Sequence, residues 1–521
     1  MDDLKQLTPM MRQYMDIKKE HQDKVLFFRL GDFYEMFDKD AEEISHLLNL
    51  TLTHRGRTPM CGIPYHAMKN YLKRLLDAGK KVAICEQFLT GNPRELAERK
   101  VTQIYTPGTV VEDEYLDSFS SSFILSVSKD RKGIYTSWCD ISTGEFYIRN
   151  LRLDKGYSEL ENLLESVKPK ELLVPDDLYF SDIAFRETCD RSSSIITKLP
   201  IWYFSKKTGK EELEKHFSPN ALRLYAIDPK DGILSVIGAL LEYVEENAKS
   251  ELPQLRTIER IEDESYIALN AAAVRNLELI SSMTGSREGS LIDTIDRTLT
   301  SSGLRLLKFT LLHPLRKKED IERRQRWVKR LMEDRAERER IRNSLQSSSD
   351  LERLSSKASM KRLTPRDFIA IADTIVAFFA MIQQRSEYME FLDDELTGSF
   401  SDLISLSQDI VMGISRECTN ISNEGTIILP GFDERLDELN EYVRNGSSIL
   451  QEYLDKVTRE TGISNIKTGE NRIIGSYIEV SKGQLDKVPD YFIRRQTLVG
   501  GERFTTAELE EIKYRLSTAE S

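Results

Sequence analysis

Phe33 and Glu35 stand two residues apart in the stretch RLGDFYEMF (29–37), just after an apolar run that Gly31 and Asp32 interrupt. A phenyl ring held at a surface can wedge into a stack of bases, most readily where that stack is already weak. A carboxylate beside it would either accept a hydrogen bond from a base or be protonated through a raised pKa. The alternative is packing in a small α/β core, and the residues alone leave that as the more common arrangement for Phe33.

A basic window, 54–74, follows this pair and contains no acidic residue. Its basic residues are Arg55, Arg57, Lys69, Lys73 and Arg74. The whole chain carries a net charge of −12, which taken alone argues against a dedicated nucleic-acid binder. A whole-chain sum hides local stripes, so the window is either a contact surface or an ordinary solvated face.

Other chemistry finds no support in the motifs. The sequence contains no G-x-x-x-x-G-K-[ST] phosphate loop, no C-x-x-C or H-x-x-x-H spacing for a metal, and no G-x-S-x-G nucleophile turn. His54, Cys61, His66 and Cys85 are therefore not predicted to bind zinc. The residues predict no catalytic site.

Length and composition predict a packed protein of several domains. The 521 residues correspond to about three or four domains. Apolar residues make up 40% and charged residues 31%, and no apolar run approaches the roughly 18 residues that a membrane span needs. The five cysteines are scattered and odd in number, which indicates free thiols in a reducing compartment.

Two α/β regions are predicted in the first half. Up to about residue 115, Val25–Leu30 and 82–85 read as strands, 71–76 as a helix, and 58–64 as a loop because two prolines and a glycine punctuate it. The region 121–250 begins with strand patterns, followed by alternating helix and strand. The strand patterns are 122–128, 134–138, 146–148 and 171–174.

Helical periodicity takes over from about residue 265. Thr364 and Pro365 mark a helix start, and that helix is predicted to run to about residue 392. A heptad stripe over 432–457 predicts a coiled arm, broken near Asn445. A β-like stretch, 472–481, comes next. Thr505 and Glu508 have capping-box spacing at the start of a last helix, and the chain stops within its pattern, so an incomplete product is expected.

Several stretches resemble one family, in its order along the chain. RLGDFYEMF and PMCGIPYHAMKNYLKRLLDAGKKVAICEQ (59–87) resemble the mismatch-recognition region of the bacterial-type MutS DNA mismatch repair family. AVRNLELI (273–280) resembles its central helical region, and GSYIEVSKGQ (475–484) resembles its DNA clamp. The sequence is thereby identified as a member of that family.

The resemblance implies a multidomain fold of α/β domains and long helices. The implied domains are a mixed α/β mismatch-recognition domain (1–115), an α/β connector (120–250), a helical lever (255–425), a clamp with a small sheet inserted in the lever (426–505) and the start of the returning lever helix (506–521). The ATPase domain that follows in the family is expected to be absent here, and with it the family's DNA-dependent ATPase activity.

The resemblance also implies site residues. Phe33 would stack on the mispaired or unpaired base, and Glu35 would hydrogen-bond it. Contacts to the DNA backbone are expected from Arg55, Arg57, Lys467, Arg472 and Lys482. For Arg494 and Arg495, a structural role and a phosphate contact remain open.

The implied partner is duplex DNA with a mismatch or a small insertion/deletion loop. No cofactor is expected in this chain, since ATP and magnesium belong to the family's missing domain. A homodimer weakened by that loss, a MutL-type partner of the complete protein, no membrane, and a cytoplasmic, nucleoid-associated location of prokaryotic type are further expectations. The alternative is a short regulatory or structural partner of a full-length MutS subunit.

Overall fold

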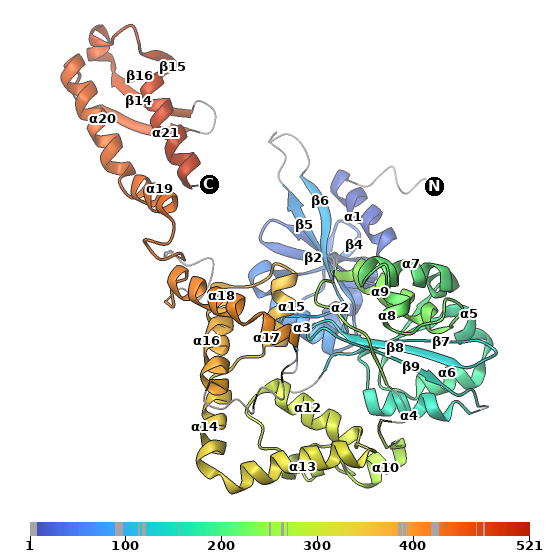
Figure 1. The fold of residues 1–521 in the computed structure, drawn as a ribbon. Coiled ribbons are helices and arrows are strands. Elements are labelled where there is room, and N and C mark those ends of the chain that lie inside the picture. The colour runs from blue at the N-terminus through green and yellow to red at the C-terminus, as the bar shows by residue number, and fades with distance from the viewer. Residues whose placement is uncertain are drawn as a thin grey trace. The chain divides into compact units, whose positions relative to one another are not determined.

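The computed structural model divides into two compact units, Met1–Ser407 and Gln408–Ser521 (Figure 1). The structure describes residues 8–88, 97–112, 115–116, 121–154, 156–248, 252–261, 265–267, 269–383, 388, 392, 394–417, 427–464, 466–471 and 475–520. Within those residues, no helix is both long enough and apolar enough to cross a membrane.

The first sheet has six strands in the order β3-β4-β2-β1-β5-β6. All neighbours pair antiparallel except β1 and β5, which are parallel. The strands are β1 (Val25–Leu30), β2 (Phe33–Phe37), β3 (Thr53–Arg55), β4 (Thr58–Pro64), β5 (Val82–Phe88) and β6 (Glu98–Tyr105). The accompanying helices are α1 (Pro9–Glu20), α2 (Asp38–Leu48), η2 (Tyr65–Ala67) and α3 (Met68–Asp77).

Alternate side chains of this sheet enter two separate cores. Tyr34 and Met36 pack in one cluster with Leu72 of α3, while Phe28 and Phe37 pack in another with Tyr14 of α1. This alternation is the period of two that a strand imposes on its side chains. The helix that covers the second core begins where Thr8 caps it, the Thr8 side chain accepting from the Met11 N–H.

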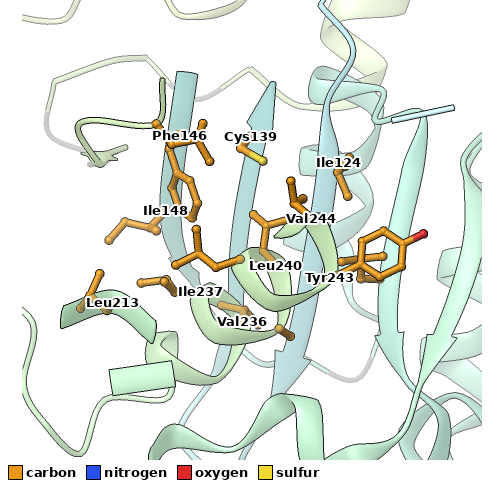
Figure 2. Packing of buried hydrophobic residues seen from close by; sticks show 14 of the residues in the cluster. Ile124, Cys139, Phe146, Ile148, Leu213, Val236, Ile237, Leu240, Tyr243 and Val244 are labelled. Carbon is orange, nitrogen blue, oxygen red and sulfur yellow. The ribbon is translucent and has the colours of Figure 1, made fainter. Parts of the chain in front are cut away.

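The second sheet has the order β11-β10-β7-β8-β9-β12. Its strands are β7 (Ile124–Lys129), β8 (Ile134–Asp140), β9 (Glu145–Leu151), β10 (Glu171–Pro175), β11 (Ile195–Leu199) and β12 (Glu259–Arg260). The helices of this region are α4 (Ser158–Val167), α5 (Asp176–Ser181), α6 (Ile183–Asp190), η3 (Ile201–Phe204), α7 (Lys206–His216), α8 (Ala221–Leu224) and α9 (Ile233–Ala248). Figure 2 shows α9 across the strands, with Ile237 and Leu240 toward Ile148 and Cys139. Helix α9 is buried along nearly its whole length, which explains its apolar sequence.

A buried ion pair joins the two sheets. The Glu171 carboxylate has no exposed surface, and it lies 2.9 Å from the ammonium of Lys81, the residue just before β5. It also accepts hydrogen bonds from the hydroxyls of Thr106, Thr197 and Tyr243. Burial alone would raise the pKa of Glu171, but Lys81 and these donors outweigh it and leave the pKa below its ordinary value. The stabilisation is therefore complete above the ordinary pKa and is lost as the pH falls below it.

Helices dominate the remainder of the first unit. They are α10 (Ala271–Asn276), α11 (Leu291–Ile295), α12 (Ser301–Leu312), α13 (Lys318–Glu333), α14 (Arg335–Gln346), α15 (Leu351–Ser359), α16 (Pro365–Ile382), α17 (Asp394–Gly398) and α18 (Phe400–Gly413), whose last turn extends past Ser407. Thr364 and Asp367 form a capping box at the start of α16. Arg305 of α12 binds Asp350, just before α15, through two nitrogens at 2.7 and 2.9 Å.

The second unit packs helices on a small antiparallel sheet of order β13-β14-β16-β15. Its elements are α19 (Glu434–Arg444), α20 (Gly446–Thr461), β13 (Lys467–Asn471), β14 (Gly475–Ser481), η5 (Lys482–Lys487), β15 (Ile493–Thr497), β16 (Gly501–Thr505) and α21 (Ala507–Glu520). Tyr453 and Val457 of α20 share a core with Ile478, Phe504 and Leu509.

The mixed α/β, multidomain class predicted from the sequence is confirmed, as are most of the predicted elements. The break in the heptad stripe falls at Asn445, between α19 and α20. The free thiols are confirmed for the four cysteines in the described residues, all of them buried; Cys418 lies outside those residues.

Three local predictions were wrong. Residues 58–64 form strand β4 rather than a loop. Helix α16 ends at Ile382, not near 392. The last helix is capped by Thr506, whose hydroxyl accepts from the Leu509 N–H, because Thr505 is still paired in β16.

The buried ion pair yields a stability prediction. Lys81→Met leaves the Glu171 carboxylate buried without its cation, which should lower the free energy of unfolding by about 3–5 kcal/mol. Urea unfolding followed by tryptophan fluorescence, to which Trp138 in the second sheet contributes, measures this.

Lys80→Met is the matched control. Lys80 pairs with Glu43 at the surface, so its loss should change the same quantity by less than about 1 kcal/mol. Adding Glu171→Gln to Lys81→Met should recover much of the loss. Equal effects of Lys80→Met and Lys81→Met would contradict the role given to the buried pair.

Candidate functional site

Phe33 is the first residue of β2, directly after the turn that joins β1 to β2. Gly31 holds a left-handed backbone there, with φ +60°, which suits a residue without a side chain. Leu30 pairs with Phe33 across the turn. The Phe33 side chain is 48% exposed while Tyr34 is 3% exposed, so the pleat directs the phenyl ring outward. The structure thus places Phe33 outside the core.

Glu35 lies on the same face of β2, two residues further along. Its Oε2 is 3.0 Å from Nη1 of Arg55, which ends β3. Gly62 of β4 pairs with Glu35 and has no side chain that could cover the carboxyl group. The phenyl ring and the carboxyl group therefore belong to β2, and the guanidinium group belongs to β3, with β4 between the two strands.

The surroundings of Glu35 favour its neutral form. Partial burial raises the pKa of the carboxyl group above its ordinary value, and the ion pair with Arg55 opposes that rise without cancelling it. The site therefore combines an exposed ring with an acid that is easier to protonate than a solvated glutamate.

The basic window divides in the structure. Arg55 and Arg57 are exposed on the β3–β4 hairpin, where Gly56 has φ +66°. Arg74 on α3 instead donates to the carbonyls of Leu47 and Leu48, at the end of α2. Arg74 therefore has a structural contact, while contacts of Arg55 and Arg57 with a DNA backbone stay predictions.

The remaining predicted backbone contacts belong to the second unit. Lys467 on β13 and Lys482 on η5 are exposed, and Arg472 lies outside the described residues. Arg494 lies 2.9 Å from Glu502, and Arg495 pairs with Glu510, so both arginines hold ion pairs within their own unit. Both arginines thus have partners within their own unit, and a phosphate contact of Arg494 or Arg495 stays a prediction.

Two residues beside the turn were missed by the sequence reasoning. The Arg29 Nε donates to the Gly31 carbonyl at 2.5 Å, and its guanidinium lies 3.9 Å from the ring centre of Tyr65. The sequence offered one signal for Arg29, a charged residue near the end of an apolar strand. It offered no signal for Tyr65, because the residues that Tyr65 contacts, Arg29 and Asp32, are distant in sequence.

In the described part of the chain, the thiols are buried and no cluster of metal-binding side chains accompanies the ring and the carboxyl group. Across the residues that the structure describes, no group of three or more His, Cys, Asp or Glu side chains could hold a metal ion. Cys61 and Cys85 lie in the same sheet, and burial raises their thiol pKa values to about 11 and about 12. The chemistry available here is stacking, hydrogen bonding and charge.

Comparisons with known proteins give one consistent result. Models of MutS domain I, MutS domain II and MutS domain III match residues 8–114, 122–256 and 272–512. The DNA mismatch repair protein MutS of Treponema denticola is 34% identical, over 98% of this chain and 59% of its own length. The protein of that name from Thermotoga maritima is 36% identical, over 98% and 62%, and that from Petrotoga mobilis 37%, over 99% and 62%. The chain thus spans about three fifths of these relatives' length.

The ion pair at the site yields a titration prediction. Arg55→Ala removes the interaction that lowers the pKa of Glu35 and leaves burial unopposed, so that pKa should rise further. NMR titration of isotope-labelled glutamate carboxyl groups, with the Glu35 signal assigned from Glu35→Gln, measures it. Arg57→Ala, in the same hairpin, is the control and should leave the Glu35 titration in place. A lower or unchanged Glu35 pKa in Arg55→Ala would refute this electrostatic account.

Proposed function

Because this chain belongs to the MutS family of DNA mismatch repair proteins, we propose that it recognises mismatched or unpaired bases in duplex DNA. The observation that carries the proposal is the half-exposed ring of Phe33 at the β1–β2 turn, beside the partly buried carboxyl group of Glu35. An exposed aromatic ring can stack on a base, because the base offers a flat apolar face of matching size.

In this proposal Phe33 inserts into the base stack and kinks the duplex. Opening a stack costs a few kcal/mol in a paired duplex and less at a mismatch, so the same ring enters more easily where pairing is faulty. The ring is mounted on a strand that is hydrogen-bonded on both sides, to β1 and β4. A strand paired on both sides resists displacement, so the ring can press into the base stack while its own backbone stays in place.

Glu35 provides the second contact. Its pKa is already raised by burial, and nearby phosphates would raise it again because they disfavour a further negative charge. The protonated carboxyl group would donate a hydrogen bond to an acceptor on the displaced base. Arg55, released from the ion pair, would then be available to a phosphate.

Other parts of the chain receive family roles as proposals. The long helices α13 to α16 would belong to the lever, and the sheet and helices of Gln408–Ser521 would contain the clamp, with Lys467 and Lys482 facing the DNA backbone. Their exposure supports such electrostatic contacts. ATP with magnesium, a homodimer and a MutL-type partner are proposed for the complete protein, since the relatives are longer than this chain.

Removing the ring tests the proposal. Phe33→Ala should abolish the preference for a G·T mismatch over a matched duplex, which corresponds to a loss of about 1–3 kcal/mol of stacking. Affinity for matched duplex should change little, since backbone charges provide it. Fluorescence anisotropy with both duplexes, at one stated salt concentration, gives the ratio.

Phe180→Ala is the matched control for this test. Phe180 is 66% exposed on α5, far from the site in sequence, so its loss should leave the ratio unchanged. A Phe33→Ala chain that still discriminates would overturn the proposal. Absence of any DNA binding by the unaltered chain would favour the regulatory-partner alternative.

The raised pKa of Glu35 predicts a pH dependence. A larger share of Glu35 is protonated as the pH falls, so the mismatch preference should rise as the pH is lowered. Glu35→Gln, which is neutral throughout, should flatten that profile. Glu42→Gln, an exposed residue of α2, is the control and should keep it. Anisotropy titrations across the pH range measure the ratio, and an unaltered slope in Glu35→Gln would exclude Glu35 as the titrating group.

A further inference from the structure

We propose that Arg29 and Tyr65 are positioning residues for mismatch recognition, which brace the β1–β2 turn so that the Phe33 ring is held ready to insert. The inference rests on the proposed role of Phe33 and deepens it. Neither residue needs to touch the mismatched base, because both act through the backbone that carries the ring.

Both carbonyl groups of the turn are held by these two residues. The Gly31 carbonyl accepts from the Arg29 Nε at 2.5 Å. The Asp32 carbonyl accepts from the backbone N–H of Tyr65 at 2.9 Å. A two-residue turn with a glycine in the left-handed region has wide conformational freedom, and these bonds restrict it directly before Phe33.

The Arg29 side chain is itself fixed in place. Its guanidinium lies 3.9 Å from the ring centre of Tyr65 and 5.4 Å from that of Tyr34. Glu86 on β5 holds the far end, with its Oε2 4.0 Å from Nη1 of Arg29 and its Oε1 accepting from the Tyr34 hydroxyl. Stacking on a ring requires the flat guanidinium, and lysine does not reproduce it.

This brace lies on the opposite face of the sheet from Phe33. Arg29 pairs with Tyr34, whereas Leu30 pairs with Phe33, so the pleat separates the two pairs. A substitution of Arg29 therefore leaves the face that carries Phe33 and Glu35 unaltered. The expected result is a ring that is present but less well ordered before binding, and ordering it on binding weakens recognition.

Three substitutions in the full chain test the inference. Arg29→Lys keeps the positive charge and loses the stacked, forked geometry, and Tyr65→Ala removes the ring beneath it. Tyr65→Phe keeps that ring. Two readouts apply to each variant: the ratio of affinities for G·T and matched duplexes, and the fluorescence of 2-aminopurine placed beside the mismatch, which increases when the neighbouring base is unstacked.

Arg29→Lys and Tyr65→Ala should lower the affinity ratio by about three- to tenfold and reduce the 2-aminopurine signal at saturating protein. Affinity for matched duplex and the thermal midpoint should stay close to those of the unaltered chain. Tyr65→Phe should restore both readouts. A structural defect alone would lower the midpoint and matched binding together, and that result overturns the inference.

An Arg29→Lys chain with the same affinity ratio as the unaltered chain would also overturn the inference, because a positive charge without the planar guanidinium would then be sufficient to hold the turn. Phe33→Ala, measured in parallel, separates this failure from that of the proposed function. If Phe33→Ala loses discrimination while Arg29→Lys and Tyr65→Ala retain it, only the brace is wrong. If Phe33→Ala retains discrimination, the recognition role itself is wrong, and the brace has nothing to position.

Discussion

The buried carboxylate of Glu171 helps to fix the position of the first sheet, which carries the candidate site. It binds the ammonium of Lys81, and the Lys81 carbonyl accepts from the Val25 N–H at the first residue of β1. A charge without exposed surface tolerates little displacement, since losing its cation would leave it uncompensated. The strand that leads into the Phe33 turn is thereby tied to the second sheet, and polar contacts join the two α/β regions.

The register of β2 against β1 and β4 determines which of its side chains are buried and which face outward. In the observed register Tyr34 and Met36 fill one core and Phe37 the other, which leaves Phe33 and Glu35 beyond the cover of α1. A slip by one residue would reverse every side chain of β2 and bury a charge in place of a tyrosine. The outward direction of Phe33 therefore follows from what its neighbours bury. The exposure of the Phe33 ring and the stability of the sheet depend on the same alternation.

Local patterns in the sequence predicted most elements, and long-range contacts account for what they missed. Thr364 with Asp367 identified a helix start because capping is decided within four residues. Strand β4 was missed because Pro59 and Pro64 suggested a loop, although both stand near its ends, where a strand tolerates proline. Phe33 and Glu35 were singled out from the sequence, and their outward direction was predicted from a family resemblance. The contact of Glu35 with Arg55 and the position of Tyr65 beside the turn depend on pairing that no single stretch of sequence reveals.

The one parallel pairing of the first sheet has a consequence for the order of folding. The β1–β2 hairpin pairs residues only a few positions apart, whereas β1 and β5 join Val25 to Val82 across the intervening strands and helices. Short loops close faster than long ones, so we expect the hairpin to form early and the β1–β5 pairing late. The element that carries the ring would then exist first as a mobile local structure. It would become rigid only when the last long-range contact closes, which would couple complete folding of this region to the recognition proposed for Phe33.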